Sequence, residues 1–172
     1  MSPGENAAPA DRAVPQLEWD GRDLGPLDPL APLLPGRRAE LLAVADESEL
    51  VALADRCLAA TPDTKVIEPP TVGTIPLCVR EPVVGERFIL ADVLATRAEV
   101  EHRGQRGWAM RLGGDAAATL AAAVCDAEAA AGAGLALEVD LLCRRTERDR
   151  ADDAAREWAE LARTEVRFEE LT

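Results

Sequence analysis

Residues 85–100, GERFILADVLATRAEV, form the longest stretch of this sequence that is typical of a single extended strand. Successive side chains of a strand point to opposite faces of its sheet. From Phe88 to Ala95 both alternating sets are almost wholly apolar, whereas from Arg97 onward one set is charged. A small antiparallel sheet with helices on one side needs only one apolar face. The first half of this strand is therefore expected to need a second cover, which another subunit could provide.

Two shorter extended segments flank this strand. Residues 71–81 alternate in character before it, and residues 106–112 follow the next turn as a return strand. Short connections between such segments are typical of an antiparallel meander, here of about three strands. Pro76 confines the first segment to a sheet edge or a bulge. Pro69–Pro70 predicts a turn that separates it from a weaker extended segment, residues 65–68.

A helical hairpin is predicted before the strands. Residues 37–44 carry leucines at helical spacing, and a second helix with the same spacing runs to about Ala60. Asp46, with Glu49 three residues later, is the signature of a capping box at the start of the second helix. The Thr61-Pro62-Asp63 sequence then ends it.

Further helices are predicted after the strands. Asp115 is the expected N-cap of an alanine-rich helix over residues 116–131, which Gly132 ends. Residues 135–142 fit a strand or a helix, because the run is apolar throughout, and residues from 149 onward have helical periodicity. Val166 and Phe168 suggest a short final strand. Together these elements predict an α+β fold: an N-terminal helical hairpin, an antiparallel β-meander, and C-terminal helices packed on the sheet.

The composition excludes several classes of partner. A formal net charge of −13 argues against nucleic acid or an anionic membrane as the main partner. The sequence has no run of eighteen apolar residues and no secretory leader, so we expect a cytoplasmic protein. Its four cysteines lack any C-x-x-C spacing and are expected to be small buried residues. Proline recurs throughout residues 1–36, which predicts a disordered tail before a single domain of residues 37–172.

Groups suited to catalysis are few. His102 is the single histidine and lies in a charged turn, where solvation is the expected role, and no metal-binding or phosphate-loop spacing is present. The Gly113-Gly114-Asp115 turn could bind an anion at a helix start, but Asp115 is expected to cap those amides itself. Trp108 and Trp158 are expected to be packing anchors.

The long strand supplies the candidate binding or interface residues. Arginines on predicted strands suit carboxylate or phosphate groups, although pairing with the surplus acids of this chain is the simpler expectation. Arg97 is the best exception, because it breaks an apolar face. The apolar side chains of the same strand are the other candidates. The full set is Arg80, Arg87, Phe88, Leu90, Leu94 and Arg97.

An ordered series of residues resembles the PhnG family, the G subunit of the carbon–phosphorus lyase system, over about residues 37–169. Two departures stand out, Pro82-Val83-Val84 and Ala91, at positions where that family usually has glycines. The series that carries the resemblance is Val72-Gly73, Arg80, GERF at residues 85–88, Thr96-Arg97, Val100, Gly107, Leu112-Gly113, Asp115 and Asp126-Ala127.

The resemblance implies a cytosolic complex with the H, I and J subunits. In that system the G, H and I subunits, with the L subunit, transfer the ribosyl triphosphate of MgATP to an organic phosphonate and release adenine. The J subunit, a radical enzyme with an iron–sulfur cluster, later breaks the C–P bond. The nucleosidase-type chemistry is associated with the I subunit, so the resemblance implies a supporting subunit that binds no cofactor itself, with MgATP as substrate of the complex.

Two other hypotheses rest on the residues alone. An independent homodimeric binding or structural module would cover the apolar strand by pairing it across a two-fold axis. A small phosphate-ester enzyme would use the arginines, but it needs a base and a metal or nucleophile that the sequence does not offer.

Overall fold

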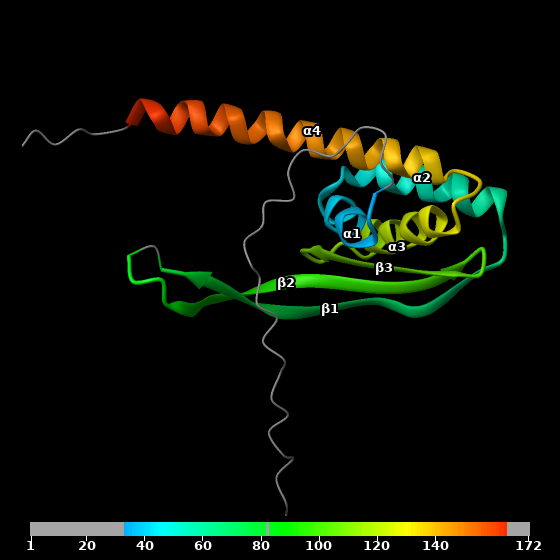
Figure 1. Cartoon of the computed structure of the whole chain (residues 1–172). Helices are drawn as coiled ribbons and strands as arrows, with labels where there is room; N and C mark the ends of the chain where they lie inside the picture. The colour runs from blue at the N-terminus through cyan, green and yellow to red at the C-terminus, as the bar shows by residue number, and fades with distance from the viewer. Residues whose placement is uncertain (1–32, 82, 165–172) are drawn as a thin grey trace, which may run out of the picture. The chain divides into compact units, whose positions relative to one another are not determined.

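The computed structural model describes residues 33–81 and 83–164, and these form an α+β domain, as the sequence predicted. Two helices precede a three-stranded sheet and two long helices follow it (Figure 1). The predicted final strand at Val166 and Phe168 lies outside the described residues, as does most of the predicted tail. The elements are α1 (Pro35–Val44), α2 (Glu47–Ala60), β1 (Thr64–Arg80), β2 (Arg87–His102), β3 (Gln105–Leu112), α3 (Ala116–Ala131), α4 (Ala136–Leu161) and a 3-10 turn (Ala162–Thr164).

Local chemistry sets the helix ends as expected. The Asp46 carboxylate accepts a hydrogen bond from the Glu49 amide at 3.0 Å and caps α2. The Asp115 carboxylate does the same for α3 through the Ala118 amide at 2.9 Å. Gly132 ends α3 in the left-handed conformation, with φ of 63°. The capping and terminator predictions are therefore confirmed.

The sheet is antiparallel in the order β1-β2-β3. The predicted turn at Pro69–Pro70 is wrong, because β1 runs on through both prolines to pair with β2 along its length. The register shifts on either side of Glu68 show how this happens: extra residues of β1 bulge out of the ladder. Proline has no backbone N–H to donate to the ladder, but a bulged residue on an edge strand does not need to donate one. The strand can therefore bend at the two prolines and continue beyond them.

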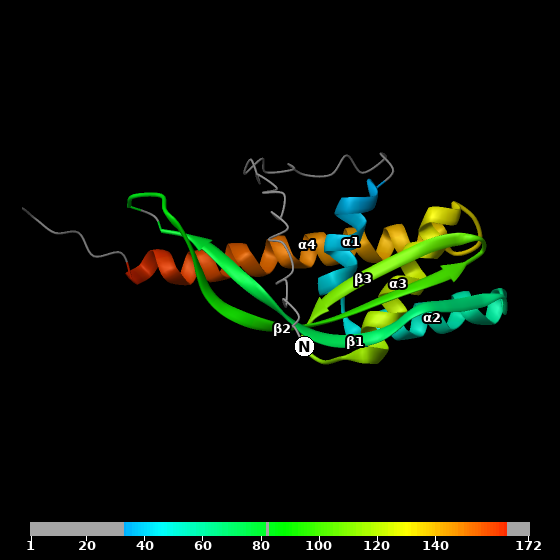
Figure 2. The same cartoon turned by 90° about the horizontal axis from the view of Figure 1, so that it is seen from below.

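The helices lie on one side of the sheet, with α3 directly against β2 and β3 (Figures 1 and 2). Close approach is possible because Gly107 of β3 has no side chain: a Cβ there would collide with the Ala123 carbonyl oxygen and the Ala127 amide nitrogen of α3. The interior between these elements is small-residue packing, with Ala98, Ala109, Ala122, Ala123 and Ala127 all buried.

Helix α4 resolves the ambiguity of residues 135–142: Leu135 precedes the helix as its N-cap, and residues 136–142 are helical and continue without a break to Leu161. Its buried side chains all lie in its first half, and Trp158 in the second half is 73% exposed. The expectation that Trp158 is a packing anchor is therefore wrong, and Trp108 is also exposed, at 43%. Among the cysteines, Cys78 is exposed and the other three are buried. No helix in the described part of the chain is long and apolar enough to cross a membrane.

Candidate functional site: the distal ribbon

The outer ends of β1 and β2 form a two-stranded ribbon. Strand β3 pairs with β2 only from Ala95 to His102, and the ladder closes with the Gly113 amide donating to the Leu94 carbonyl at 2.9 Å. Residues 87–94 of β2 therefore pair only with residues 74–80 of β1. This segment, called the distal ribbon here, extends past β3 and α3 (Figures 1 and 2).

The distal ribbon exposes large apolar side chains. Phe88 is 47% exposed, Leu90 59%, Leu94 49%, and their neighbour Ile89 66%. Full burial of an exposed side chain of this size gains about 1.5–3 kcal/mol, and because these side chains are already partly covered, each would gain about half of that. Isolated two-stranded ribbons are marginally stable in water, and large exposed apolar patches mark binding surfaces. The distal ribbon is therefore the surface of this domain best suited to contact another molecule.

A bulge at Leu90 distributes these side chains over both faces. Leu77 pairs with Ala91 and the adjacent Cys78 pairs with Ile89, so Leu90 is an extra residue in β2. The alternation of faces shifts by one position across such a bulge. Phe88, paired with Val79, consequently lies on the opposite face from Leu94, although sequence alternation alone would place both on one face.

The tip of the ribbon brings two of the candidate arginines together. Arg80 and Arg87 are paired across the strands, and the Arg80 guanidinium donates to the Gly85 carbonyl at 3.1 Å. The Glu81 carboxylate accepts hydrogen bonds from the amides of Val84 and Val83, which lower its pKa. The two valine side chains are 76% and 89% exposed, respectively, so the described residues of the tip place apolar side chains between the two arginines.

Arg97 lies at the base of the ribbon and is already paired. Its guanidinium makes a two-pronged ion pair with Glu68, with Nε 3.0 Å from Oε1 and Nη2 also bonded to Oε2. This bonding raises the pKa of Arg97. The sequence made Arg97 the best exception to pairing with the acids of this chain. The structure instead pairs Arg97 with Glu68 of the same chain, so the simpler expectation holds. The structure brings Arg80, Arg87, Phe88, Leu90 and Leu94 together on the ribbon and leaves Arg97 at its edge.

A buried polar cluster, which the sequence did not reveal, lies at the opposite end of β2. His102 is fully buried, so its predicted role as a solvated turn residue is wrong. Its Nε2 lies 2.8 Å from Glu128 Oε2, and its Nδ1 lies 2.6 Å from Thr64 Oγ1. Residues 96, 98, 100 and 102 share the buried face of β2, and this alternation could have placed His102 inside.

Glu128 is the centre of this cluster. It also accepts hydrogen bonds from Arg103 Nε at 2.6 Å and from the Leu135 amide at 2.6 Å. Burial raises the pKa of Glu128, but the bonds from Leu135, Arg103 and His102 together outweigh burial and hold that pKa below its usual value. One carboxylate thereby joins α3, the turn after β2 and the start of α4. Both carboxylate oxygens accept hydrogen bonds from groups within the fold, which is typical of a structural role.

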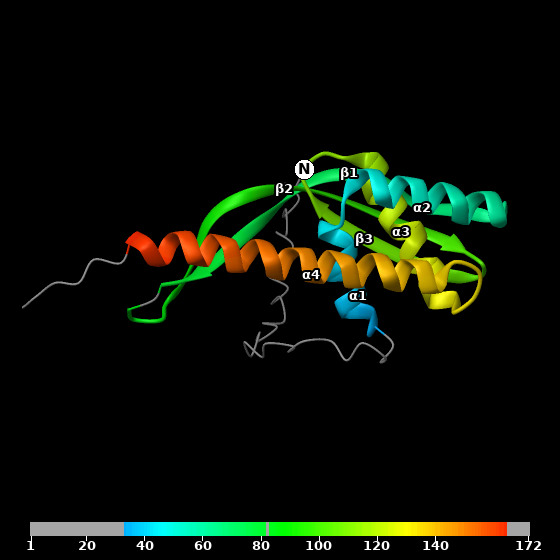
Figure 3. The same cartoon turned by 90° about the horizontal axis from the view of Figure 1, so that it is seen from above.

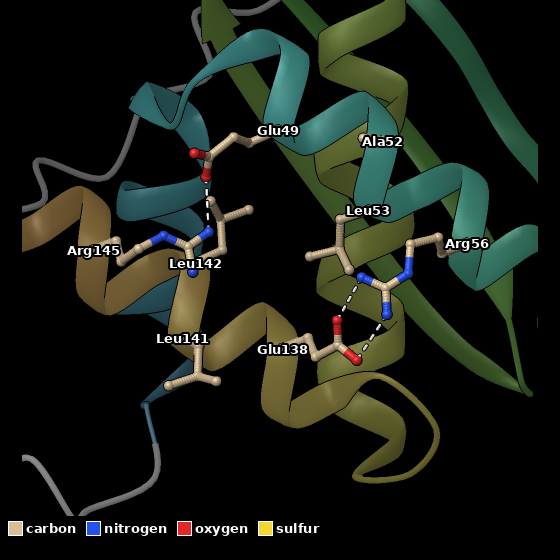
Figure 4. A pocket seen from close by; sticks show the side chains of 8 residues that line it. All are labelled: Glu49, Ala52, Leu53, Arg56, Glu138, Leu141, Leu142 and Arg145. Atoms are coloured by element: carbon tan, nitrogen blue, oxygen red, sulfur yellow. Dashed lines mark hydrogen bonds and ion pairs between the residues drawn. The ribbon is translucent and has the colours of Figure 1, made fainter.

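A groove lies between α2 and α4 (Figure 4). It encloses about 330 Å³, and buried Leu53 and Leu142 line it. Ion pairs close both ends: Arg56 with Glu138 at 2.6 Å, and Arg145 with Glu49 at 2.8 Å. Because these charges neutralise each other, the groove offers apolar contact and little that would activate a substrate. Within residues 33–81 and 83–164 no group of three histidine, cysteine or acidic side chains could hold a metal ion.

Fold and site together define a small α+β protein whose most distinctive surface is an uncovered ribbon. The family model of phosphonate metabolism protein PhnG matches residues 36–172, and the chain belongs to this family. A search of curated proteins finds no match to this chain. The family assigns the chain a role in phosphonate metabolism.

Proposed function

We propose that this chain is a subunit of a carbon–phosphorus lyase core complex. In this role it supports the transfer of the ribosyl triphosphate of MgATP to an organic phosphonate with release of adenine. Its partners are the H, I and J subunits, with the L subunit acting in the same reaction, and the complex works in the cytoplasm. The chain itself acts as a supporting subunit, and MgATP is a substrate of the complex.

The family match and the distal ribbon support this proposal. The match spans most of the chain, and the family acts in phosphonate metabolism. The single observation that points to a subunit role is the exposure of Phe88, Ile89, Leu90 and Leu94 on one short ribbon. Because these side chains are about half exposed, leaving them in water forgoes about half of 1.5–3 kcal/mol each, and the sum is substantial beside a net domain stability of about 5–15 kcal/mol. A partner that covers the ribbon recovers that energy.

Co-expression tests the proposal directly. This chain, tagged, is produced with candidate H, I and J subunits from the same source and purified through its tag. We expect a stoichiometric complex that releases adenine from MgATP when the L subunit and a phosphonate are added. Recovery of this chain alone as a soluble dimer would contradict the proposal and favour an independent homodimeric module.

A matched pair of variants locates the contact. Phe88 and Val44 are both 47% exposed, but Val44 lies on α1, away from the ribbon. We expect Phe88→Ser to reduce recovery of the complex at least about tenfold, because aromatic anchors dominate interface energies, and Val44→Ser to leave recovery unchanged. Equal recovery of the two variants would exclude the ribbon as the contact.

A further inference from the structure

The outer half of α4, residues 148–161, contacts no core of its own. Every side chain in this segment is exposed, whereas the first half of the same helix buries Val139, Leu142, Cys143 and Thr146. In folded proteins most of the stability of a helix comes from the packing of an amphipathic face and not from helix propensity. Fourteen consecutive exposed helical residues therefore indicate a surface that is completed by something outside this domain.

An apolar stripe runs along this segment. Its members recur at intervals of three and four residues, which places them on one side of a helix. Two of them are large: Trp158 is 73% exposed and Leu161 is 53% exposed. Tryptophan is enriched among the residues that dominate interface energies, and an amphipathic helix can bind in an apolar groove through such anchors. The stripe consists of Ala151, Ala154, Ala155, Trp158 and Leu161.

The charges around the stripe specify the partner. The segment carries five acidic residues against three arginines. Arg156 pairs with Asp153 and Arg148 lies near Asp149, whereas Asp152, Glu157 and Glu160 form no ion pair with any residue of the described chain. An acidic rim around an apolar stripe is complementary to an apolar groove bordered by lysine or arginine. It disfavours a second copy of the same acidic helix and the anionic surface of a membrane.

The position of the segment fits contact with the same assembly as the ribbon. Figures 1 and 3 show the outer half of α4 and the distal ribbon at the same end of this domain. We propose that the outer half of α4 is a docking helix that seats Trp158 in an apolar groove bordered by basic residues on a partner subunit. This inference rests on the proposed function, since it requires that the chain work inside a complex.

The test compares two exposed residues of one helix in the full chain, assembled with the candidate H, I and J subunits. Trp158 and Leu137 are 73% and 71% exposed, but Leu137 lies in the packed half of α4. We expect Trp158→Ala to weaken assembly at least about tenfold and Leu137→Ala to change it less than about twofold. Neither substitution should shift the melting temperature of the isolated chain, so loss of folding cannot imitate loss of docking.

A charge variant gives an independent readout. Changing Asp152 to Asn with Glu157 and Glu160 to Gln keeps the stripe but removes the unpaired acids. We expect a weaker complex whose affinity also depends less on salt concentration, because screening acts on exposed charges.

Several outcomes would overturn the inference. If the complex forms and Trp158→Ala assembles like the parent chain, the docking helix is wrong while the proposed function stands. If no complex forms with any subunit, both are wrong. A self-dimer that Trp158→Ala dissociates would identify a second copy as the occupant. Binding of the parent chain, but not Trp158→Ala, to vesicles of mixed zwitterionic and anionic lipid would identify a membrane. Either of these last two results contradicts a basic groove on a partner subunit.

Discussion

The two halves of β2 place their side chains in opposite ways. The inner half, residues 95–102, is covered by α3 and bordered by β3, and it buries small or polar residues such as Ala98, Val100 and His102. The outer half, residues 87–94, has neither cover, yet it carries the largest apolar side chains of the strand, Phe88, Ile89 and Leu90. The strand therefore buries its small residues within the domain and exposes its large ones.

Under the proposed function, this difference separates a packing role from an association role within one strand. In the inner half, small side chains and Gly107 of the neighbouring strand let α3 approach closely, and that close packing holds the domain together. In the outer half, large side chains contribute little to the isolated domain because water still reaches them. Substitutions in the inner half should thus act on stability, and those in the outer half on association.

The largest effect is expected at the buried end of the inner half. Glu128→Ala removes the carboxylate that holds His102, Arg103 and the Leu135 amide, and leaves buried donors without an acceptor. Breaking such a buried pair lowers the free energy of unfolding by about 3–5 kcal/mol. Denaturant unfolding of the isolated chain measures this change in the free energy of unfolding. A decrease of less than about 1 kcal/mol would show that water replaces the carboxylate.

Glu128 also makes a specific contribution to the pH dependence of stability. Because its pKa is lowered in the folded chain, its contribution is complete above the unfolded value, near 4.3, and is lost as pH falls through the folded pKa. The parent chain should lose stability below about pH 4.3 more steeply than Glu128→Gln does. Unfolding midpoints measured between pH 7 and pH 3 test this, and parallel curves would mean that Glu128 does not titrate in this range.

The second effect is smaller and contrasts two glycines. Gly107→Ala places a methyl group against the backbone of α3, whereas a methyl group at Gly73 of β1 meets nothing within 4 Å. Overpacking of this kind lowers the free energy of unfolding by about 1–3 kcal/mol, and we expect the upper end because backbone atoms cannot rotate away. Gly73→Ala should remain within about 0.5 kcal/mol of the parent chain. Equal losses would mean that α3 does not depend on Gly107 for its approach.

Features set by local chemistry could be predicted from the sequence. The caps at Asp46 and Asp115 each use a side chain and an amide three residues apart, so the sequence contains the whole interaction. The unusual apolarity of the outer half of β2 could also be predicted, because it depends only on the alternation of residues within one strand. Both predictions needed no knowledge of distant segments.

Features that depend on distant residues could not be predicted. The environment of His102 is set by Glu128 on another element, and Arg97 is neutralised by Glu68 of the neighbouring strand. The bulges that carry β1 through Pro69–Pro70 and shift β2 at Leu90 arise from the register of the two strands. The pattern of residues within a single segment does not determine how two strands are paired.

A third prediction compares the two halves of β2 directly. Val100 is fully buried, and Val100→Ala removes two methyl groups from the interior, which should lower the free energy of unfolding by about 2 kcal/mol. Phe88→Ala removes a larger side chain, but one that is half exposed, and should lower it by less than about 1 kcal/mol. Urea titration of both isolated variants measures the two decreases in the free energy of unfolding. The reverse order would show that the distal ribbon is already packed without a partner.

The smallest effect is expected at the border of the two halves, where Arg97 meets Glu68. The pair is half exposed, and exposed ion pairs contribute about 0–1 kcal/mol, so Arg97→Ala should change the free energy of unfolding by less than about 1 kcal/mol.

Arg106→Ala is the matched control, since Arg106 pairs with Glu99 of β2 at 2.7 Å within the inner half. In the assembled complex both variants should release adenine from MgATP within about twofold of the parent rate, because each guanidinium is bonded to an acid of its own chain. A drop of tenfold or more for Arg97→Ala alone would place Arg97 at a substrate or a partner. The border between the two halves would then belong to the site, and the ion pair with Glu68 would be the resting arrangement of a binding residue.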